Sequence, residues 1–352
     1  MKARLTMASK LDTQTYLGNI INNQLISTAK TRHSIDPATS QPLYEVPVAK
    51  KEDLDAAVYA ARKAFQPWST TPFSERANLL LKYADTIEHH RDDLEQLLTQ
   101  EQGKPLSLSK SELDMTLTWL RAFATMEIKD EVLQEDDEKI VYSTHPPIGV
   151  CAGIVPWNWP VLLGIGKLGP ALITGNTFIM KPSPYTPYCD LKLGELATTV
   201  FPPGVVQVLS GDDNLGPWIT EHPGIDKIAF TGSIATGKLV AASCAKTLKR
   251  YVLELGGNDA AIVCEDVDID KCLPKIATLS FLNSGQICML TKRIYIHESI
   301  YDTFRDKMVE FTKSNIKTGA GTEDGVVVGP VQNKMQYATI PLSSNSQRQY
   351  RI

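Results

Sequence analysis

Between residues 148 and 263, short apolar runs alternate with segments of helical periodicity, and this alternation constrains the fold more than any other feature. Short runs bounded by turn residues are typical of buried strands. Strand, helix and strand in this order build a parallel sheet with right-handed crossovers. We therefore expect an α/β fold with a Rossmann-type sheet and any ligand at the carboxyl ends of its strands. The predicted strands are 148–155, 177–180, 205–209, 227–230, 251–255 and 260–263, and helices at 161–173, 187–199, 214–221 and 235–248 separate the first five.

The chain before this region predicts a small β structure and three helices. Asn22-Asn23 separates two apolar runs and indicates a tight turn. Apolar residues at helical spacing predict helices over 52–66, 72–98 and 109–123. His89 and His90 lie among charged residues, so we expect both on the solvent face of the second helix. A charged loop over 135–139 then precedes a short strand at 140–144.

Composition narrows the possible functions. The 352 residues are 43% hydrophobic, enough for a large core and two domains. A net charge of −4 gives no broad basic surface, and no apolar run reaches about eighteen residues, so we expect neither nucleic acid nor a membrane as partner. The six cysteines show no CxxC pair and no Cys/His cluster, which argues against a metal site and favours a reducing compartment, the cytoplasm.

Chemically useful side chains follow the predicted strands. Asn158 lies in a turn held by two prolines, where its amide could stabilise an oxyanion. Lys181 puts a cation at a strand end, and Gly232 opens a turn before a helix, which favours anion binding. Glu254 precedes two glycines, and Cys288 follows small and amide residues, so the pair could supply a base and a nucleophile.

Each of these residues, taken alone, also fits a simpler interpretation. Cys288 alone would be a buried structural thiol, as we expect for Cys151 and Cys264 inside their strands. Glu254 alone could be a satisfied core carboxylate, and Lys181 a surface residue. The segment 232–238 matches GxxxxGK, but Leu239 stands where a P-loop needs Ser or Thr for magnesium, so a nucleoside triphosphatase is a weak alternative.

Six motifs in one order resemble the aldehyde dehydrogenase superfamily from about Ile20 to Gln336. They are PWNWP at 156–160, GKLGPAL at 166–172, KPSPYTP at 181–187, FTGSIATG at 230–237, LELGG at 253–257 and GQIC at 285–288. The resemblance implies oxidation of a small-molecule aldehyde to a carboxylic acid with NAD or NADP. It also implies a cofactor domain, a catalytic domain and a β element that forms homo-oligomers, and Glu254 places the chain in the hydrolytic branch.

The resemblance also implies a role for each matching residue. Cys288 would attack the aldehyde as a thiolate, Asn158 and the backbone N–H of Cys288 would form the oxyanion hole, and Glu254 would activate water to hydrolyse the thioester. Lys167 would take part in a proton relay. Cys288 and Glu254 should therefore converge on one carbonyl carbon. The implied cofactor-binding residues are Ile154, Pro156, Trp157, Lys181, Ser183, Gly232, Ser233, Gly237, Leu255 and Gln336, and no metal is implied.

Two departures from the family pattern carry consequences. Pro184 stands where NAD-preferring relatives often have a Glu that bonds the ribose hydroxyls, so both nucleotides stay open and NAD is favoured. From residue 337 the sequence is polar and aperiodic, which predicts a disordered tail over 337–352 and a C-terminally truncated family member. The expected domains are 1–128 with 148–256 for the dinucleotide, 129–147 for oligomerisation and 257–336 as a partial catalytic domain.

Truncation would leave strands after Cys288 without neighbours and expose their edges. We therefore expect low dehydrogenase activity, and the alternative function is a catalytically inactive, nucleotide-binding remnant of the same family.

Overall fold

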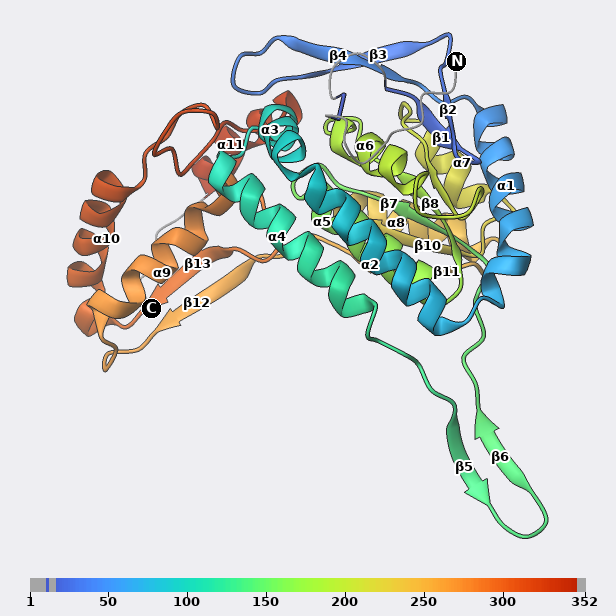
Figure 1. Cartoon of the computed structure of the whole chain (residues 1–352). Coiled ribbons are helices and arrows are strands. Elements are labelled where there is room, and N and C mark those ends of the chain that lie inside the picture. Colours follow the sequence, from blue (N-terminus) through green and yellow to red (C-terminus); the bar gives the residue numbers. More distant parts are fainter. Residues whose placement is uncertain (1–10, 13–16, 347–352) are drawn as a thin grey trace.

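The body of the protein is one twisted, mostly parallel sheet of seven strands (Figure 1). The computed structural model describes residues 11–12 and 17–346. The strand order is β11-β10-β7-β8-β9-β1-β2, and β7 to β11 all pair in parallel. This confirms the predicted α/β fold. The strands are β1 (Asn19–Ile21), β2 (Gln24–Ile26), β7 (Val150–Ile154), β8 (Thr177–Lys181), β9 (Val206–Val208), β10 (Lys227–Thr231) and β11 (Arg250–Glu254).

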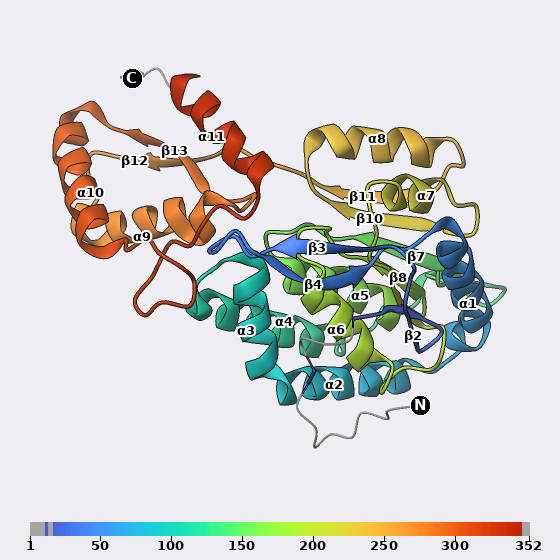
Figure 2. The same ribbon diagram turned by 90° about the horizontal axis from the view of Figure 1, so that it is seen from above.

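Helices cover both faces of this sheet (Figure 2). Alternate side chains of each strand point to opposite faces, so Cys151 and Phe178 join one core while Ala152 and Ile179 join the other. The first core packs against α2 (Phe73–His89), α4 (Leu106–Phe123), α5 (Pro160–Ile173) and α6 (Tyr188–Ala197), and the second against α1 (Lys51–Ser69), α7 (Leu215–Glu221) and α8 (Ile234–Ala245). Strand order reverses between β7 and β10, which is where such sheets bind ligands.

The predicted turn at Asn22 and Asn23 is present. Both residues have positive φ angles, 52° and 58°, as a two-residue hairpin turn requires. The N–H of Asn22 donates to Oε1 of Gln207 at 2.7 Å, which ties the hairpin to the buried strand β9. A second hairpin, β3 (Thr31–Ile35) and β4 (Pro42–Pro47), lies beside the body.

A smaller unit follows the main sheet (Figure 1). Its strands β12 (Asp259–Val263) and β13 (Thr291–Ile296) run parallel, and among the described residues they pair only with each other. Ile262 on β12 is 78% exposed, as expected for a two-stranded sheet with an uncovered face. The other elements of this unit are α9 (Ile269–Phe281), the 3₁₀ turns η1 (Leu282–Gly285) and η2 (Glu298–Ile300), α10 (Tyr301–Asn315) and α11 (Lys334–Ser346).

A long hairpin projects from the body (Figure 1). It consists of β5 (Glu131–Glu135) and β6 (Ile140–Ser143), and it exposes Val132, Leu133, Ile140 and Tyr142. The strand expected at 140–144 is therefore present, whereas β5 was not foreseen because Glu131, Gln134 and Glu135 mask its alternation. The expected role of residues 129–147 in oligomerisation stays a prediction.

Residues 337–346 belong to α11, which starts where Oδ1 of Asn333 accepts from the N–H of Gln336 at 3.0 Å. Residues 347–352 lie outside the described residues, and the expected disorder of 337–352 stays a prediction. Three other expectations from the sequence are wrong. The helix expected over 72–98 breaks at His90 into α2 and α3 (Arg91–Gln102), and His90 is buried rather than solvated. Cys264 lies just beyond β12 and is exposed.

Within the described ranges, no helix is both long enough and apolar enough to span a bilayer. In the same ranges, His, Cys, Asp and Glu side chains form no group that could hold a metal ion.

A carboxyl group lies unpaired in the core between α5 and α6. Asp190 is fully buried, and neither carboxylate oxygen has a hydrogen-bond partner among the described residues. Burial raises the pKa of Asp190 well above its ordinary value, Glu101 and Glu112 raise it further, and Lys167 opposes them. The folded protein therefore holds this carboxyl group neutral over a range of pH in which the unfolded chain ionises it.

We predict that Asp190→Asn stabilises the protein more at pH 8 than at pH 5. Because the folded pKa of Asp190 is raised, the free energy of unfolding falls as pH rises above the ordinary aspartate value of about 3.9, and the amide removes this loss. Thermal unfolding at pH 8 should show a gain of roughly 2 °C or more. The exposed Asp137→Asn variant serves as control, and equal gains at both pH values would contradict the assignment.

Candidate active site

One cavity of about 870 Å³ opens at the carboxyl ends of β7, β8 and β10, against the loop that carries Cys288. Most of the site residues implied by the sequence meet here, although they come from segments far apart in the chain. Those that line it are Ile154, Pro156, Trp157, Asn158, Lys181, Ser183, Gly232, Ser233, Leu255, Cys288 and Gln336.

The loop that carries Cys288 begins with a strained turn. Asn283, Ser284 and Gly285 all have positive φ angles, of 50°, 60° and 75°. For residues other than glycine this conformation costs about 1–3 kcal/mol each, and it persists only where the surroundings hold it. Here Oγ of Ser284 donates to the carbonyl of Gly329 at 2.8 Å, and Nδ2 of Asn283 donates to the carbonyl of Asn158 at 3.2 Å. The exposed Cys288 thus follows a turn fixed by long-range contacts.

Asn158 connects the strand-end turn to this loop. Its Nδ2 donates to the carbonyl oxygen of Gln286 at 2.9 Å, across 128 residues of sequence. An amide nitrogen carries two protons, and this bond uses one of them. The other remains for a ligand in the cavity that Asn158 shares with Cys288. The arrangement can therefore offer a hydrogen-bond donor to an oxyanion formed beside the thiol.

A buried ion pair between Lys104 and Glu112 holds the backbone of Asn158 in place. The ammonium of Lys104 is fully buried and lies 2.5 Å from Oε2 of Glu112. It also donates to the carbonyl of Asn158 at 2.9 Å and lies 4.1 Å above the ring of Trp159. The other oxygen of Glu112 accepts from the N–H of Leu162 at 3.1 Å, at the start of α5. Burial lowers the pKa of Lys104, and Glu112 opposes that shift.

Lys181 presents a second buried cation, directly in the wall of the cavity. The residue is 7% exposed, and Nζ donates to the carbonyl of Pro182 at 3.2 Å. Burial lowers its pKa to about 8, while Asp213 and Asp212 favour the charged form. An ammonium group has three protons, so donors remain for a hydroxyl or phosphate oxygen of a ligand.

The glycine turn after β10 is a helix start and not a P-loop. Ser233 caps α8, accepting from the N–H of Thr236 at 3.1 Å, and the helix begins at Ile234. Gly237 therefore lies inside the helix and not in a phosphate-binding loop. A Cβ on Gly237 would lie 2.6 Å from Cδ2 of Leu255, so a larger residue there would displace the Leu255 methyl groups that line the cavity.

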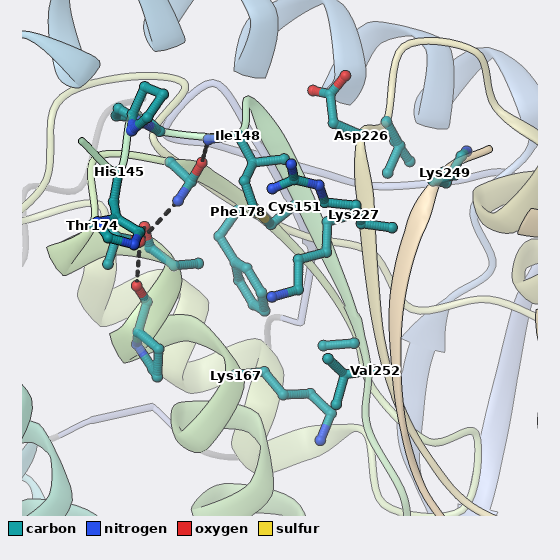
Figure 3. A pocket seen from close by; sticks show the side chains of 18 of the residues that line it. His145, Ile148, Cys151, Lys167, Thr174, Phe178, Asp226, Lys227, Lys249 and Val252 are labelled. Atoms are coloured by element: carbon teal, nitrogen blue, oxygen red, sulfur yellow. Dashed lines mark hydrogen bonds between the residues drawn. The ribbon is translucent and has the colours of Figure 1, made fainter. Parts of the chain in front are cut away.

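Lys167 and Glu254 line a different cavity, of about 1150 Å³, on the α5 side of the sheet (Figure 3). Nζ of Lys167 donates to Oγ1 of Thr231 at 2.6 Å. Burial lowers the pKa of Lys167 to about 8, and Glu254 and Asp190 partly offset this. The structure therefore groups Lys167 with Glu254, and it does not place Glu254 in the cavity of Cys288.

Strand alternation explains this separation. Val252 and Glu254 point from β11 to the α5 side, whereas Leu253 and Leu255 pack against the core on the α8 side. The cavity of Cys288 opens beside Leu255, one residue after Glu254. At Gly257, a Cβ would lie 3.1 Å from the carbonyl oxygen of Cys288, so the two motifs come together through this backbone.

Sequence reasoning missed several residues of the site. Lys292 donates to the carbonyl of Cys288 at 2.5 Å, and Asp212 and Asp213 line the cavity near Lys181. Lys104 was not among the predicted site residues, although the sequence Gly-Lys-Pro at 103–105 could have indicated a cation at a rigid turn. A single sequence does not indicate whether a charged residue outside a motif is buried or exposed.

Comparisons with known proteins agree on a single family. A sequence model of the Aldehyde dehydrogenase family matches residues 25–346. Putative aldehyde dehydrogenase FUS7 of Gibberella fujikuroi is 42% identical over 318 residues, 90% of this chain and 67% of the relative. Aldehyde dehydrogenase LUC3 of a Fusarium species is 43% identical over 91% of this chain and 67% of its own length. The chain thus spans about two thirds of these relatives. Since the family match reaches residue 346, the expectation that the family pattern stops at 336 is wrong.

Solved structures give the same result. The NAD⁺ complex of an aldehyde dehydrogenase from Bacillus cereus matches with a TM-score of 0.91 at 35% identity, over 94% of this chain and 69% of that one. An NADP-dependent enzyme of E. coli matches with a TM-score of 0.89 at 33% identity, over 92% and 68% of the two chains.

We predict that Lys104→Met destabilises the protein more than the double change Lys104→Met with Glu112→Gln. The single change leaves the buried Glu112 carboxylate without its counter-ion, which costs about 3–5 kcal/mol, whereas the amide of the double variant carries no charge. Urea unfolding of the unmodified chain, of each single variant and of the double variant gives the four free energies of a double-mutant cycle. Strictly additive losses would show that the two side chains are not coupled.

Proposed function

The chain belongs to the aldehyde dehydrogenase family, a family of NAD(P)-dependent enzymes, and from this premise we propose that it oxidises an aldehyde to a carboxylic acid through a thioester on Cys288. One observation carries the proposal. The Asn158 amide, bonded to the loop of Cys288, faces the same cavity as that thiol and as Lys181. Nucleophile, oxyanion donor and a cation suited to a nucleotide thus share one cavity.

The residues of this cavity fit a nicotinamide dinucleotide. The buried Lys181 keeps donors free toward the cavity, where a ribose hydroxyl would accept them. Trp157 and Leu255 would cover the flanks of the nucleotide, and Ser233 at the start of α8 would face its phosphates. When bound, the nicotinamide supplies the acceptor for the hydride that leaves the aldehyde carbon.

The chain itself supplies the rest of the chemistry. The sulfur of Cys288 bonds to the aldehyde carbon after losing its proton, and the carbonyl oxygen becomes an oxyanion that Asn158 can bind. After the hydride has left, the sulfur holds the acyl group as a thioester. Water then adds to that carbon, a base takes its proton, and the sulfur leaves as thiolate with release of the acid.

Glu254 is the proposed base for this hydrolysis. Because its side chain lines the cavity of Lys167, the carboxylate must turn past Leu255 to reach the thioester. The turn is available because Glu254 is exposed and ends its strand. Lys167 lines the same cavity as Glu254, and burial lowers its pKa to about 8, so its ammonium is the neighbouring proton donor in the proposed relay.

A second candidate function is nucleotide binding without turnover. Two observations favour it: Cys288 and Glu254 line separate cavities, and β12 and β13 have no further strand neighbour among the described residues. The first function requires turnover of acetaldehyde with NAD, while the second requires quenching of protein fluorescence by NAD with no product formed.

We predict that Cys288→Ala abolishes NADH formation from acetaldehyde while the affinity for NAD stays within about threefold, since the change removes the nucleophile and no nucleotide contact. Absorbance at the nicotinamide band and fluorescence titration measure the two properties. Cys264→Ala, which removes another exposed thiol, should keep the full rate. A Cys288→Ala protein with unchanged turnover would overturn the choice of nucleophile.

We predict that Glu254→Gln slows hydrolysis of the thioester by roughly 10²-fold, because the amide cannot accept a proton from water. Stopped-flow mixing should then show a rapid first turnover of NADH followed by a slow steady rate. Loss of the rapid phase together with the steady rate would assign Glu254 to formation of the thioester instead.

A further inference from the structure

The cavity wall around Lys181 contains carboxylates that the sequence motif does not supply. Position 184 holds proline, so the segment after β8 offers no carboxylate to accept from ribose hydroxyls. The neighbouring strand β9 runs parallel to β8, with Met180 opposite Val208. The loops that follow two adjacent parallel strands lie at the same sheet edge, and here the second loop brings Asp212 and Asp213 to the cavity.

The two aspartates differ in how their charge is used. Asp212 forms an ion pair with Lys30 at 2.8 Å and also accepts from the N–H of Asn214 at 3.0 Å. The pKa of Asp212 is lowered, and the hydrogen bond from Lys30 is the largest cause. Asp213 is exposed at the cavity and has no ion pair among the described residues. Its carboxylate therefore faces the cavity without a direct ion-pair partner.

Charges near Lys181 act in both directions. Lys181 and the nearby Arg32 are cations that would attract a phosphate group, whereas Asp213 and Asp212 would repel it. Asp213 raises the pKa of Lys181, Arg32 lowers it, and the influence of Asp213 is the larger of the two. Among the charged neighbours of Lys181, Asp213 therefore has the largest electrostatic effect on its ammonium group.

We propose that Asp213 is the specificity-determining residue for the cofactor: its carboxylate accepts hydrogen bonds from the adenosine ribose hydroxyls beside Lys181 and repels a 2′-phosphate, so that this chain prefers NAD to NADP. The inference rests on the proposed function, since it presumes that a dinucleotide occupies this cavity. It assigns to the loop after β9 the role that residue 184 cannot fill.

Equilibrium titration of the whole chain with NAD and with NADP, followed by protein fluorescence, tests this proposal without any need for turnover. Asp213→Asn should tighten NADP binding about tenfold, because it removes a charge next to the added phosphate. NAD binding should weaken by no more than about threefold, since an amide still accepts a hydrogen bond. Asp213→Glu should keep the preference for NAD.

Asp212→Asn is the matched control. It removes an adjacent carboxylate that Lys30 already neutralises, so the ratio of the two dissociation constants should move by less than about threefold. The preference of the unmodified chain should also shrink as salt rises from low to high concentration, because an exposed charge is screened.

The outcomes separate this inference from the proposed function. If neither nucleotide binds, both fail. If both nucleotides bind but Asp213→Asn leaves their ratio unchanged, or if Asp212→Asn shifts it equally, the inference fails while the proposed function stands.

Discussion

The buried contact between Lys104 and the carbonyl of Asn158 is the interaction on which the site most depends. Lys104 follows α3, Glu112 lies on α4, and through Leu162 the same carboxylate holds the start of α5. The turn between β7 and α5 is therefore fixed by a charge pair that water cannot reach. From that turn, Asn158 reaches the loop of Cys288, so the position of the thiol is set by helices from the other end of the chain.

Polar contacts of this kind and one small apolar cluster join the two units of the protein. In the cluster, Leu282 and Ile287 pack against Leu108, Trp159 and Leu162. Nε2 of Gln332 donates to the carbonyls of Glu101 and Tyr185, and the N–H of Leu106 donates to the carbonyl of Gly321 at 3.0 Å. The core of the smaller unit, around Val263, Leu273 and Phe304, is separate from the two cores of the main sheet. These contacts together fix where the loop of Cys288 lies against the cavity that it shares with Lys181.

The sheet divides the chemistry between its two faces. The side chains at the end of β11 alternate, so Glu254 lies with Lys167 while Leu255 forms part of the cavity of Cys288. If Glu254 is the base of the proposed reaction, its place on the opposite face from the thiol leaves room for a dinucleotide during the first half of that reaction. Its side chain would then have to move for the second half. The proposal thus assigns the conformational step to a side chain at a strand end and not to a domain.

The sequence predicted most strands, the turns and the residues around the cavity of Cys288, because each of these depends on residues that are close together in the chain. Apolar runs determine the strands, as at 177–180 and 227–230, and turn residues such as Asn22-Asn23 and caps such as Ser233 determine where elements begin. The six motifs named the residues around the cavity, since each motif keeps its chemistry within a few positions. Only the tertiary structure decided which groups meet: the burial of Lys104, Asp190 and His90, the separation of Glu254 from Cys288, and the approach of Asp213 to Lys181. These depend on which faces and loops come together across the sheet, and the free energy of a charge depends on that environment and not on its neighbours in the chain.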